Sequence, residues 1–295
     1  MAAVIAPTNR LGMTLGLHVN EQKQISLYDT ITSFPAWSSY CTQCYLSHDP
    51  WTMEQPTQAD LDQCRNFMVP YERTLMLHCA DNANLATPGA QLRGATMRLL
   101  RNHLKIANQI PCTCVLHLGT KNNKAGEGTL DRVAEGLNQL VREGHLRESI
   151  FPHIRHQLVV ENSAGQGACL GRSFDELRSL FEKLDTRKVG LLIDTQHAFA
   201  AGLTTWTDHN EVVKFFEEVE TITPYGPSGL HLNDSKPAFG SNVDRHEDIG
   251  QGQIFWSGGI KHEGLQTILA YARERGLDCI LETPDAVQDY QKLIE

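Results

Sequence analysis

The chain has 295 residues, of which 41% are hydrophobic and 21% charged, and this ordinary globular usage excludes a collagen-like, low-complexity or disordered protein. The formal net charge of -9 excludes the broad basic field that many nucleic-acid-binding domains carry, so any contact with a nucleic acid must be local. The apolar run near the N-terminus is short and is broken by Pro7 and Asn9, so we expect neither a signal peptide nor a membrane span.

The cysteines indicate a reducing compartment. Eight cysteines are too few for a disulfide scaffold in a chain of this length, and several lie in apolar runs, such as Cys112, Cys114 and Cys279, where cysteine behaves as a small hydrophobic residue. The one C-x-x-C pair, Cys41 and Cys44, lacks a second pair or an H-x-x-x-H partner, which favours structural thiols over a zinc knuckle or a redox pair. We therefore expect an intracellular protein, cytoplasmic or nuclear.

Short apolar runs recur along the chain, and each is followed by a polar loop and a helix-like segment. These runs cover residues 11–19, 38–46, 73–79, 112–119, 156–162, 189–195, 228–234 and 278–283. Continuous hydrophobicity is typical of strands that are buried on both faces of a parallel sheet, and eight βα repeats close a (β/α)8 barrel. No segment reads as a linker. We therefore predict an α/β protein with a TIM barrel as a single domain over residues 1–295, and an open doubly wound sheet is the alternative.

Three of the helical segments have clear sequence signals. Ser173 and Glu176 form a capping box ahead of LRSLFEKL, and Asp208 with Glu211 resembles one ahead of VVKFFEEV. Residues 90–110 carry a single apolar stripe at helical spacing, which predicts a helix on the surface of the barrel.

Ionisable side chains close almost every apolar run, at the strand ends where a barrel of this kind has its active site. The residues at or just beyond these ends are His18, His78, His117, Glu161, Asp194, His197, His231, Asp244, His246 and Glu282. Burying so many ionisable groups with few lysines or arginines beside them is prohibitively costly unless cations are present. Imidazole and carboxylate together suit zinc, manganese or iron better than magnesium. We predict a cluster of divalent ions, which is a standard means of hydrolysing a phosphodiester.

Five strings carry a family resemblance: VENSAGQG (160–167), LIDTQHAFAAG (192–202), HLNDSK (231–236), GSNVDRHEDIGQG (240–252) and LETP (281–284). Together they resemble the endonuclease IV family of apurinic/apyrimidinic endonucleases, and the match extends back to GLHV near residue 16. The resemblance implies a (β/α)8 barrel with three divalent ions, Zn²⁺ first and Mn²⁺ or Fe²⁺ as alternatives. It implies hydrolysis of the DNA backbone on the 5′ side of an abasic site, which leaves a 3′-hydroxyl and a 5′-deoxyribose phosphate, and also removal of blocking groups from 3′ ends.

The same resemblance implies a role for each residue of the site. The three ions would be held by three groups, of which the first two share Glu161: His78, His117 and Glu161; Glu161, Asp194, His231 and Glu282; and His197, Asp244 and His246. Glu161 and Glu282 would be catalytic, because they would orient the attacking hydroxide, and no covalent intermediate is needed.

The expected partner is double-stranded DNA that contains abasic sites or blocked 3′ ends, bound by a monomer. Its expected contacts are Lys236, Arg245, Asn233 and Gly119. Asn233 and Asp234 are expected to support the ligands or shape the loop rather than to bind metal, so Asn233 has two interpretations. His18 would support the site without binding metal. Arg93, Lys121 and Lys124 lie in or near strand-end loops, where they could contact phosphates or remain solvated surface charges.

Three loops depart from the family pattern. A basic segment whose arginine enters the DNA usually follows the second strand, but this chain has SHDPW (47–51) there. After the third strand the chain has Asp81 and Asn82 where the family commonly has an aromatic residue, and the usual H-P-G after the fourth strand is H-L-G. These changes leave hydrolysis untouched but bear on how the DNA is distorted. Trp51, Tyr45 or Trp37 could substitute, or could belong to the core.

Two other functions compete with a nuclease. Sugar isomerases and epimerases share the barrel architecture, but their sites are rich in carboxylates, hold one or two ions and lack the D-R-H segment. A catalytically weakened DNA-binding or structural protein is the third interpretation, and the complete set of ligands argues against it.

Overall fold

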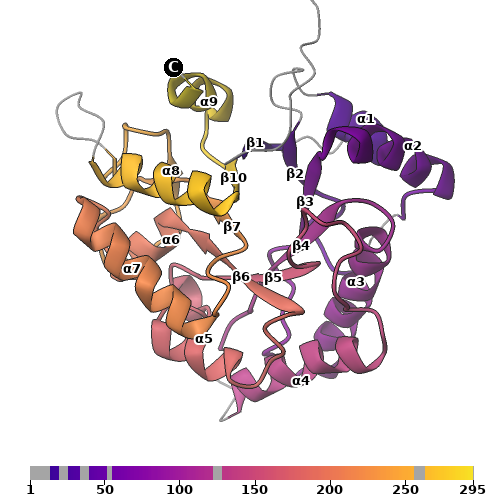
Figure 1. Cartoon of the computed structure of the whole chain (residues 1–295). Helices are drawn as coiled ribbons and strands as arrows, with labels where there is room; N and C mark the ends of the chain where they lie inside the picture. Colours follow the sequence, from indigo (N-terminus) through magenta and orange to yellow (C-terminus); the bar gives the residue numbers. More distant parts are fainter. Residues whose placement is uncertain are drawn as a thin grey trace, which may run out of the picture.

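The computed structural model describes residues 14–19, 26–33, 40–51, 55–121, 128–255 and 263–294. Eight parallel strands form a closed barrel in the order β1-β10-β7-β6-β5-β4-β3-β2 (Figure 1). Their bounds are Thr14–Val19 (β1), Cys41–Tyr45 (β2), Thr74–His78 (β3), Cys112–His117 (β4), Leu158–Glu161 (β5), Val189–Asp194 (β6), Gly229–His231 (β7) and Asp278–Leu281 (β10). All eight apolar runs contain a strand, and the strands close into a barrel. The predicted TIM barrel is therefore confirmed, and the alternative of an open sheet is wrong.

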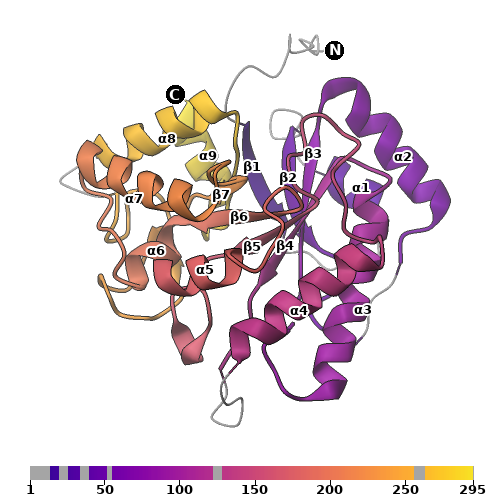
Figure 2. The same ribbon diagram turned by 60° about the horizontal axis from the view of Figure 1, so that its bottom comes forward.

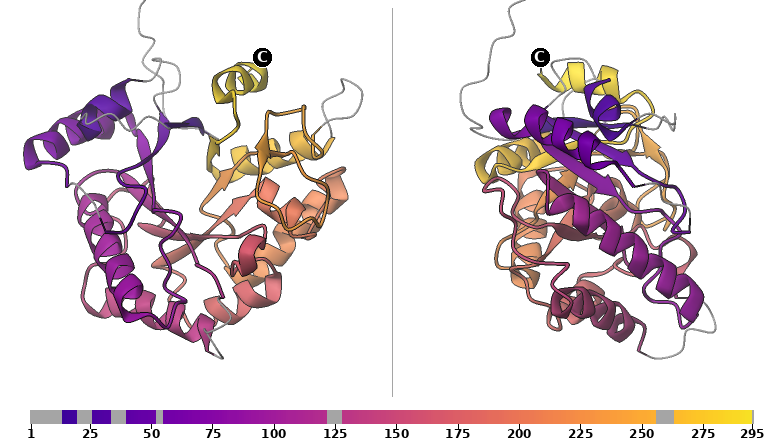
Figure 3. Two further views of the ribbon diagram at one scale, coloured as in Figure 1. Left: turned by 180° about the vertical axis from the view of Figure 1, so that it is seen from behind. Right: turned by 90° about the vertical axis from the view of Figure 1, so that its right-hand side faces the viewer.

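Helices surround the barrel on its outer side (Figure 2), and the same arrangement is visible from behind and from the side (Figure 3). Their bounds are Leu27–Thr32 (α1), Gln58–Met68 (α2), Ala90–Ala107 (α3), Thr129–Arg142 (α4), Phe174–Phe181 (α5), Thr195–Ala200 (α6), His209–Ile222 (α7), Glu263–Arg275 (α8) and Ala286–Ile294 (α9). Two 3-10 turns cover Val69–Tyr71 (η2) and Gln166–Ala168 (η3), and a small antiparallel pair joins Asp234–Ser235 (β8) to His246–Glu247 (β9).

The predicted helix starts are confirmed. Ser173 Oγ accepts the Glu176 backbone N–H at 3.2 Å at the start of α5, and Asp208 Oδ1 accepts the Glu211 N–H at 3.1 Å at the start of α7. In a capping box, the Glu176 carboxylate would accept the backbone N–H of the cap residue, Ser173. Here it accepts the backbone N–H of Gly171 instead, at 3.0 Å. The predicted helix in 90–110 is α3, whose apolar stripe packs into the core.

Inside the barrel, the side chains are arranged in an apolar layer with a polar layer above it. The apolar layer consists of Cys41, Met76, Val115, Val159, Leu192 and Ile280, all at most 2% exposed. Because side chains on a strand alternate between two faces, the residue two positions further along each strand also points inward. Those residues are Gln43, His78, His117, Glu161, Asp194 and Glu282. In the strand register, His117 pairs with Glu161, and Asp194 pairs with His231 of the neighbouring strand.

The cysteines are free thiols, and all but Cys169 are buried. Cys41 and Cys44 lie in β2, each within an apolar cluster of the described residues, which agrees with the prediction of structural thiols. Within the described ranges, no helix combines the length and the apolar character that crossing a membrane requires.

Candidate metal centre

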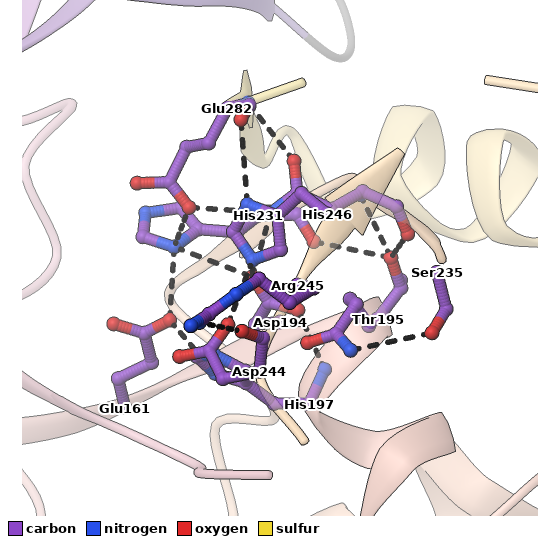
Figure 4. A network of polar contacts seen from close by, with 12 residues as sticks. Glu161, Asp194, Thr195, His197, His231, Ser235, Asp244, Arg245, His246 and Glu282 are labelled. Atoms are coloured by element: carbon purple, nitrogen blue, oxygen red, sulfur yellow. Dashed lines mark hydrogen bonds and ion pairs between the residues drawn. The ribbon is translucent and has the colours of Figure 1, made fainter. Parts of the chain in front are cut away.

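Glu161 lies at the centre of the polar layer, and its two carboxylate oxygens face different histidines. Its Oε2 lies 3.4 Å from His78 Nε2 and 3.5 Å from His117 Nε2. Its Oε1 lies 3.0 Å from His231 Nδ1 and 3.3 Å from His197 Nδ1. The side chain is only 1% exposed. Glu161 is therefore placed to bridge two cation sites, and Figure 4 shows its side toward His231.

Two further groups of ligand atoms adjoin Glu161. His231 Nδ1 lies 3.1 Å from Glu282 Oε2 and 3.8 Å from Asp194 Oδ2. On the other side of Asp194, its Oδ2 lies 3.6 Å from His246 Nε2. Asp244 completes this side, 3.2 Å from His197 Nε2 and 3.6 Å from His246 Nε2. The structure thus brings together all nine residues that the sequence suggested as ligands.

Three sets offer ligand atoms that lie within 4.8 Å of one another, and the last two share Asp194: His78, Asp81 and His117; Glu161, Asp194, His231 and Glu282; and Asp194, His197 and His246. Two atoms of these sets, Glu161 Oε2 and His246 Nε2, are buried and lack a hydrogen-bond partner among the described residues. A buried polar atom without a partner is costly, and a cation would satisfy both. The donor set of imidazoles and carboxylates fits zinc or another transition-metal ion.

The titration behaviour shows how strongly these groups interact. Burial disfavours the charged form of His231, but Glu282 and Glu161 raise its pKa well above the usual 6.5. Burial opposes the charged form of His197 in the same way, and Asp194 raises its pKa well above 6.5. Burial also opposes ionisation of Glu161 and Glu282, yet neighbouring imidazoles hold both pKa values well below 4.5. The carboxylates are therefore ionised and require positive charge beside them.

These pKa shifts predict opposite pH dependences for the metal-free and zinc-loaded protein. The raised histidine pKa values stabilise the metal-free fold fully below pH 6.5, and this stabilisation is lost as the pH rises through the folded pKa values. The lowered pKa values of Glu161 and Glu282 stabilise the metal-free fold fully above pH 4.5. This stabilisation is lost as the pH falls through the pKa values of the two carboxylates in the folded protein. We expect the metal-free Tm to be highest between these limits, whereas zinc affinity rises with pH because ligands must be deprotonated. Thermal unfolding with and without zinc measures both, and a metal-free Tm that climbs from pH 6.5 to about pH 8 would contradict the assignment.

The comparisons with known proteins agree with this geometry. The family model of the xylose isomerase-like TIM barrel matches residues 41–295. A probable endonuclease 4 from Methanosphaera stadtmanae is 30% identical over 241 residues, which cover 81% of either chain. The chain belongs to the endonuclease IV family. This confirms the resemblance that the sequence strings indicated.

Other relatives of this endonuclease IV family member extend the comparison. A probable endonuclease 4 from Halothermothrix orenii is 28% identical over 241 residues, covering 79% of this chain and 80% of that protein. Endonuclease IV from Thermus thermophilus aligns with a TM-score of 0.76 at 24% identity, over 95% of this chain and 96% of that one. A D-tagatose 3-epimerase-like protein aligns with a TM-score of 0.64 at 17% identity over 96% of each chain, so the fold is shared with sugar-processing proteins.

Asn233 makes hydrogen bonds to two of the candidate ligands. Its Nδ2 donates to Asp194 Oδ2 at 2.6 Å and to Glu282 Oε2 at 3.2 Å, and its Oδ1 accepts the Glu282 backbone N–H at 2.9 Å. The side chain is fully buried. The expected contact of Asn233 with DNA is corrected accordingly, because a fully buried side chain is not accessible to a DNA strand, and the interpretation as a supporting residue fits.

Asp234, next along the chain, shapes the loop of the D-R-H segment. Its carboxylate accepts backbone N–H groups from Ser235 at 2.7 Å, Gly250 at 2.9 Å and Ile254 at 2.8 Å. The bonds tie the segment after His246 to the barrel, which agrees with the loop-shaping interpretation.

Gly119 and His18 have different outcomes. Gly119 has a φ of +91°, and a Cβ there would lie 2.2 Å from Asn84 Oδ1, so the close approach of Asn84 is what requires a glycine. Gly119 is itself buried, and its expected DNA contact is therefore corrected to a packing role. His18 lies in β1, in register with Gln43 of β2, but its side chain is outside the described part of the chain, so its supporting role stays a prediction.

Lys236 and Arg245 are both exposed beside the metal centre. The Lys236 backbone N–H donates to the Arg245 carbonyl at 3.1 Å, so the β8–β9 pair places both cations next to Asp244 and His246. The other basic candidates are placed less favourably. Lys121 forms an ion pair with Glu176 at 2.5 Å, Arg93 is half-buried in α3, and Lys124 lies outside the described residues.

The aromatic candidates for entering DNA also differ. Tyr45 packs its ring 4.7 Å from the His78 ring and donates its hydroxyl to Asp81 Oδ1 at 2.8 Å, so it is held against a ligand. Trp51 is 53% exposed in the loop after β2, and Trp37 is outside the described residues. Asp81 itself, 72% exposed, adds a carboxylate beside His78 and His117 that the sequence did not suggest as a ligand.

Proposed function

We propose that this protein hydrolyses the phosphodiester on the 5′ side of abasic sites in double-stranded DNA, leaving a 3′-hydroxyl and a 5′-deoxyribose phosphate. The single observation that carries the proposal is the position of Glu161, whose two oxygens face separate histidine pairs in the polar layer of an endonuclease IV family member. A carboxylate that bridges two cation sites is suited to phosphodiester hydrolysis, where adjacent ions clamp the attacking and leaving oxygens.

The proposed ligands divide among three divalent ions, most favourably Zn²⁺, with Mn²⁺ or Fe²⁺ as alternatives. The ligand groups are His78, His117 and Glu161; Glu161, Asp194, His231 and Glu282; and His197, Asp244 and His246. When bound, these ions lower the pKa of a water molecule and neutralise charge on the phosphodiester. Removal of 3′ blocking groups would use the same residues.

In this mechanism Glu161 and Glu282 orient the attacking water in line with the 3′ oxygen that leaves. The water oxygen bonds to phosphorus, the bond from phosphorus to the 3′ oxygen breaks, and the proton released from water compensates the 3′ alkoxide. Lys236 and Arg245 hold phosphates of the strand beside the site. We expect the protein to act as a monomer.

The proposal is tested on one preparation by two measurements. Elemental analysis counts metals per chain, and a duplex that contains a single tetrahydrofuran abasic analogue reports nicking without β-elimination. About three ions with a cut that leaves a 3′-hydroxyl is the expected result. One or two ions with an intact duplex and turnover of a free sugar would overturn the proposal in favour of the epimerases that share this fold.

The two exposed cations predict a salt-sensitive contact. We expect Lys236→Ala to weaken binding of the tetrahydrofuran duplex and to reduce the slope of log Kd against log salt by about 1, with kcat unchanged, because it removes one phosphate contact. Arg245→Ala should act in the same way. Lys214→Ala, an exposed lysine on the outer helix α7, is the matched control. Equal salt slopes for Lys236→Ala and Lys214→Ala would remove Lys236 from the proposed interface.

A further inference from the structure

Gln43 of β2 lies in the polar layer but offers no usual metal ligand. It follows Cys41 of the apolar layer by two positions, as His78 follows Met76, and so it points into the barrel. Its side chain is fully buried. Gln43 contacts two of the proposed ligands, which the sequence analysis did not foresee.

The hydrogen bonds of Gln43 determine its amide orientation. One polar atom of the Gln43 amide lies 2.6 Å from Glu282 Oε1. Because an ionised carboxylate can only accept a hydrogen bond, this atom is the donating Nε2. The other end, Oε1, therefore lies 2.9 Å from His231 Nε2. Because an amide oxygen can only accept, His231 Nε2 must carry a proton. The lone pair of the neutral His231 ring is then on Nδ1.

This tautomer is the one that the proposed metal site needs. His231 Nδ1 faces Glu161 Oε1 at 3.0 Å and Glu282 Oε2 at 3.1 Å, within the ligand group that also contains Asp194. A protonated Nδ1 could not bind a cation at this position. The orientation of one buried amide therefore decides whether His231 can serve as a ligand.

Two other histidines of the site are oriented differently. His78 Nδ1 lies 2.8 Å from the Cys79 carbonyl, and His197 Nδ1 lies 2.9 Å from the Asn162 carbonyl. Backbone carbonyls thus make Nδ1 the protonated atom and leave Nε2 as the ligand atom in these two rings. In His231 the protonated atom is Nε2 instead. Its hydrogen-bond partner is the side chain of Gln43, which can be substituted.

We propose that Gln43 is a positioning residue that selects the Nδ1 ligand tautomer of His231 and holds the Glu282 carboxylate toward the same cation. The inference rests on the metal site of the proposed function but not on the cleavage of DNA. Outer contacts of this kind typically contribute 10- to 100-fold to metal affinity. Replacing Gln43 by Leu removes both the acceptor for His231 and the donor for Glu282, and it leaves a branched apolar side chain that is one bond shorter.

The test compares Gln43→Leu with Gln157→Leu in the full-length protein. Gln157 is also fully buried, but its Nε2 donates to the Ala107 carbonyl at 3.0 Å, away from the proposed ligands. Zinc affinity is measured by competition with a chromogenic chelator. We expect Gln43→Leu to weaken one bound zinc by about 10- to 100-fold and Gln157→Leu to leave all zinc affinities within about twofold. The metal-free Tm of each variant reports any loss of fold.

A second readout observes the tautomer directly. Long-range ¹H–¹⁵N spectra of the zinc-loaded protein distinguish a protonated ring nitrogen from a zinc-bound one. We expect His231 to carry its proton on Nε2 and to bind through Nδ1, while His78 and His197 show the reverse, and we expect Gln43→Leu to lose the His231 pattern. A His231 bound through Nε2, or a Gln43→Leu zinc affinity equal to the wild type, would overturn the role of Gln43 alone. Zinc-loaded protein that shows the expected pattern but does not nick DNA would overturn the proposed function alone, and a wild-type protein that binds no zinc would overturn both.

Discussion

Glu161→Gln is expected to abolish nicking of the tetrahydrofuran duplex, with kcat lowered on the order of a thousandfold or more while the barrel stays folded. The substitution keeps the shape of the side chain but removes the negative charge that faces His78 and His117 on one side and His231 on the other. An amide cannot bridge two cations with two anionic oxygens. Single-turnover cleavage measures the loss, and circular dichroism with thermal unfolding checks the fold.

The matched control for this variant is Glu143→Gln. Glu143 undergoes the same chemical change at the end of α4, where its carboxylate pairs with Arg101 at 2.8 Å on the surface. We expect its cleavage rate to remain within about twofold of the wild type, since surface ion pairs contribute little. A Glu161→Gln enzyme with near-normal turnover would show that the bridging carboxylate is not part of the reaction.

Removal of the metals is expected to have the second large effect. Exhaustive chelation should stop nicking altogether and lower the Tm on the order of 10 °C, because a ligand at a thousand times its Kd stabilises a fold by about 4 kcal/mol. The physical reason is that chelation leaves the ionised Glu161, Asp194 and Glu282 close together in a buried layer. Cleavage assays and thermal unfolding, before and after chelation, measure the two effects.

Restoration with defined ions makes this result specific. Zn²⁺ should restore both nicking and Tm, and Mn²⁺ or Fe²⁺ should restore part of either, whereas Ca²⁺ should restore neither because it takes oxygen ligands only. Full activity in protein that elemental analysis shows to be free of metal would contradict the proposed metal site.

The barrel and its set of candidate ligands could be predicted because both follow from short stretches of the chain. Each strand carries its own continuous apolar run, and the residue that closes the run is the one that a parallel barrel presents at its active face. The spacing of two between Met76 and His78, or between Val159 and Glu161, places an apolar residue and a ligand on the same face of one strand. Such local patterns need no knowledge of which strands become neighbours.

The same spacing held signals for the residues that the sequence analysis missed or misplaced. Gln43 follows Cys41 by two positions, and Asn233 follows His231 by two, so both could have been assigned to the inner face. What this spacing could not give is the partner of each amide. Gln43 meets Glu282 across 239 positions of the chain, and Asn233 meets Asp194 across 39.

Local sequence patterns therefore determine some features of this protein, and tertiary contacts determine the others. The apolar runs and the ionisable residues at their ends are enough to predict the fold, the ligand types and the family, because strand periodicity acts within a few residues. The roles of Gln43, Asn233 and Asp81, and the ring nitrogen that His231 offers, depend on closure of the barrel. Closure pairs β10 with β1, which itself lies beside β2, so that side chains from opposite ends of the chain become hydrogen-bond partners.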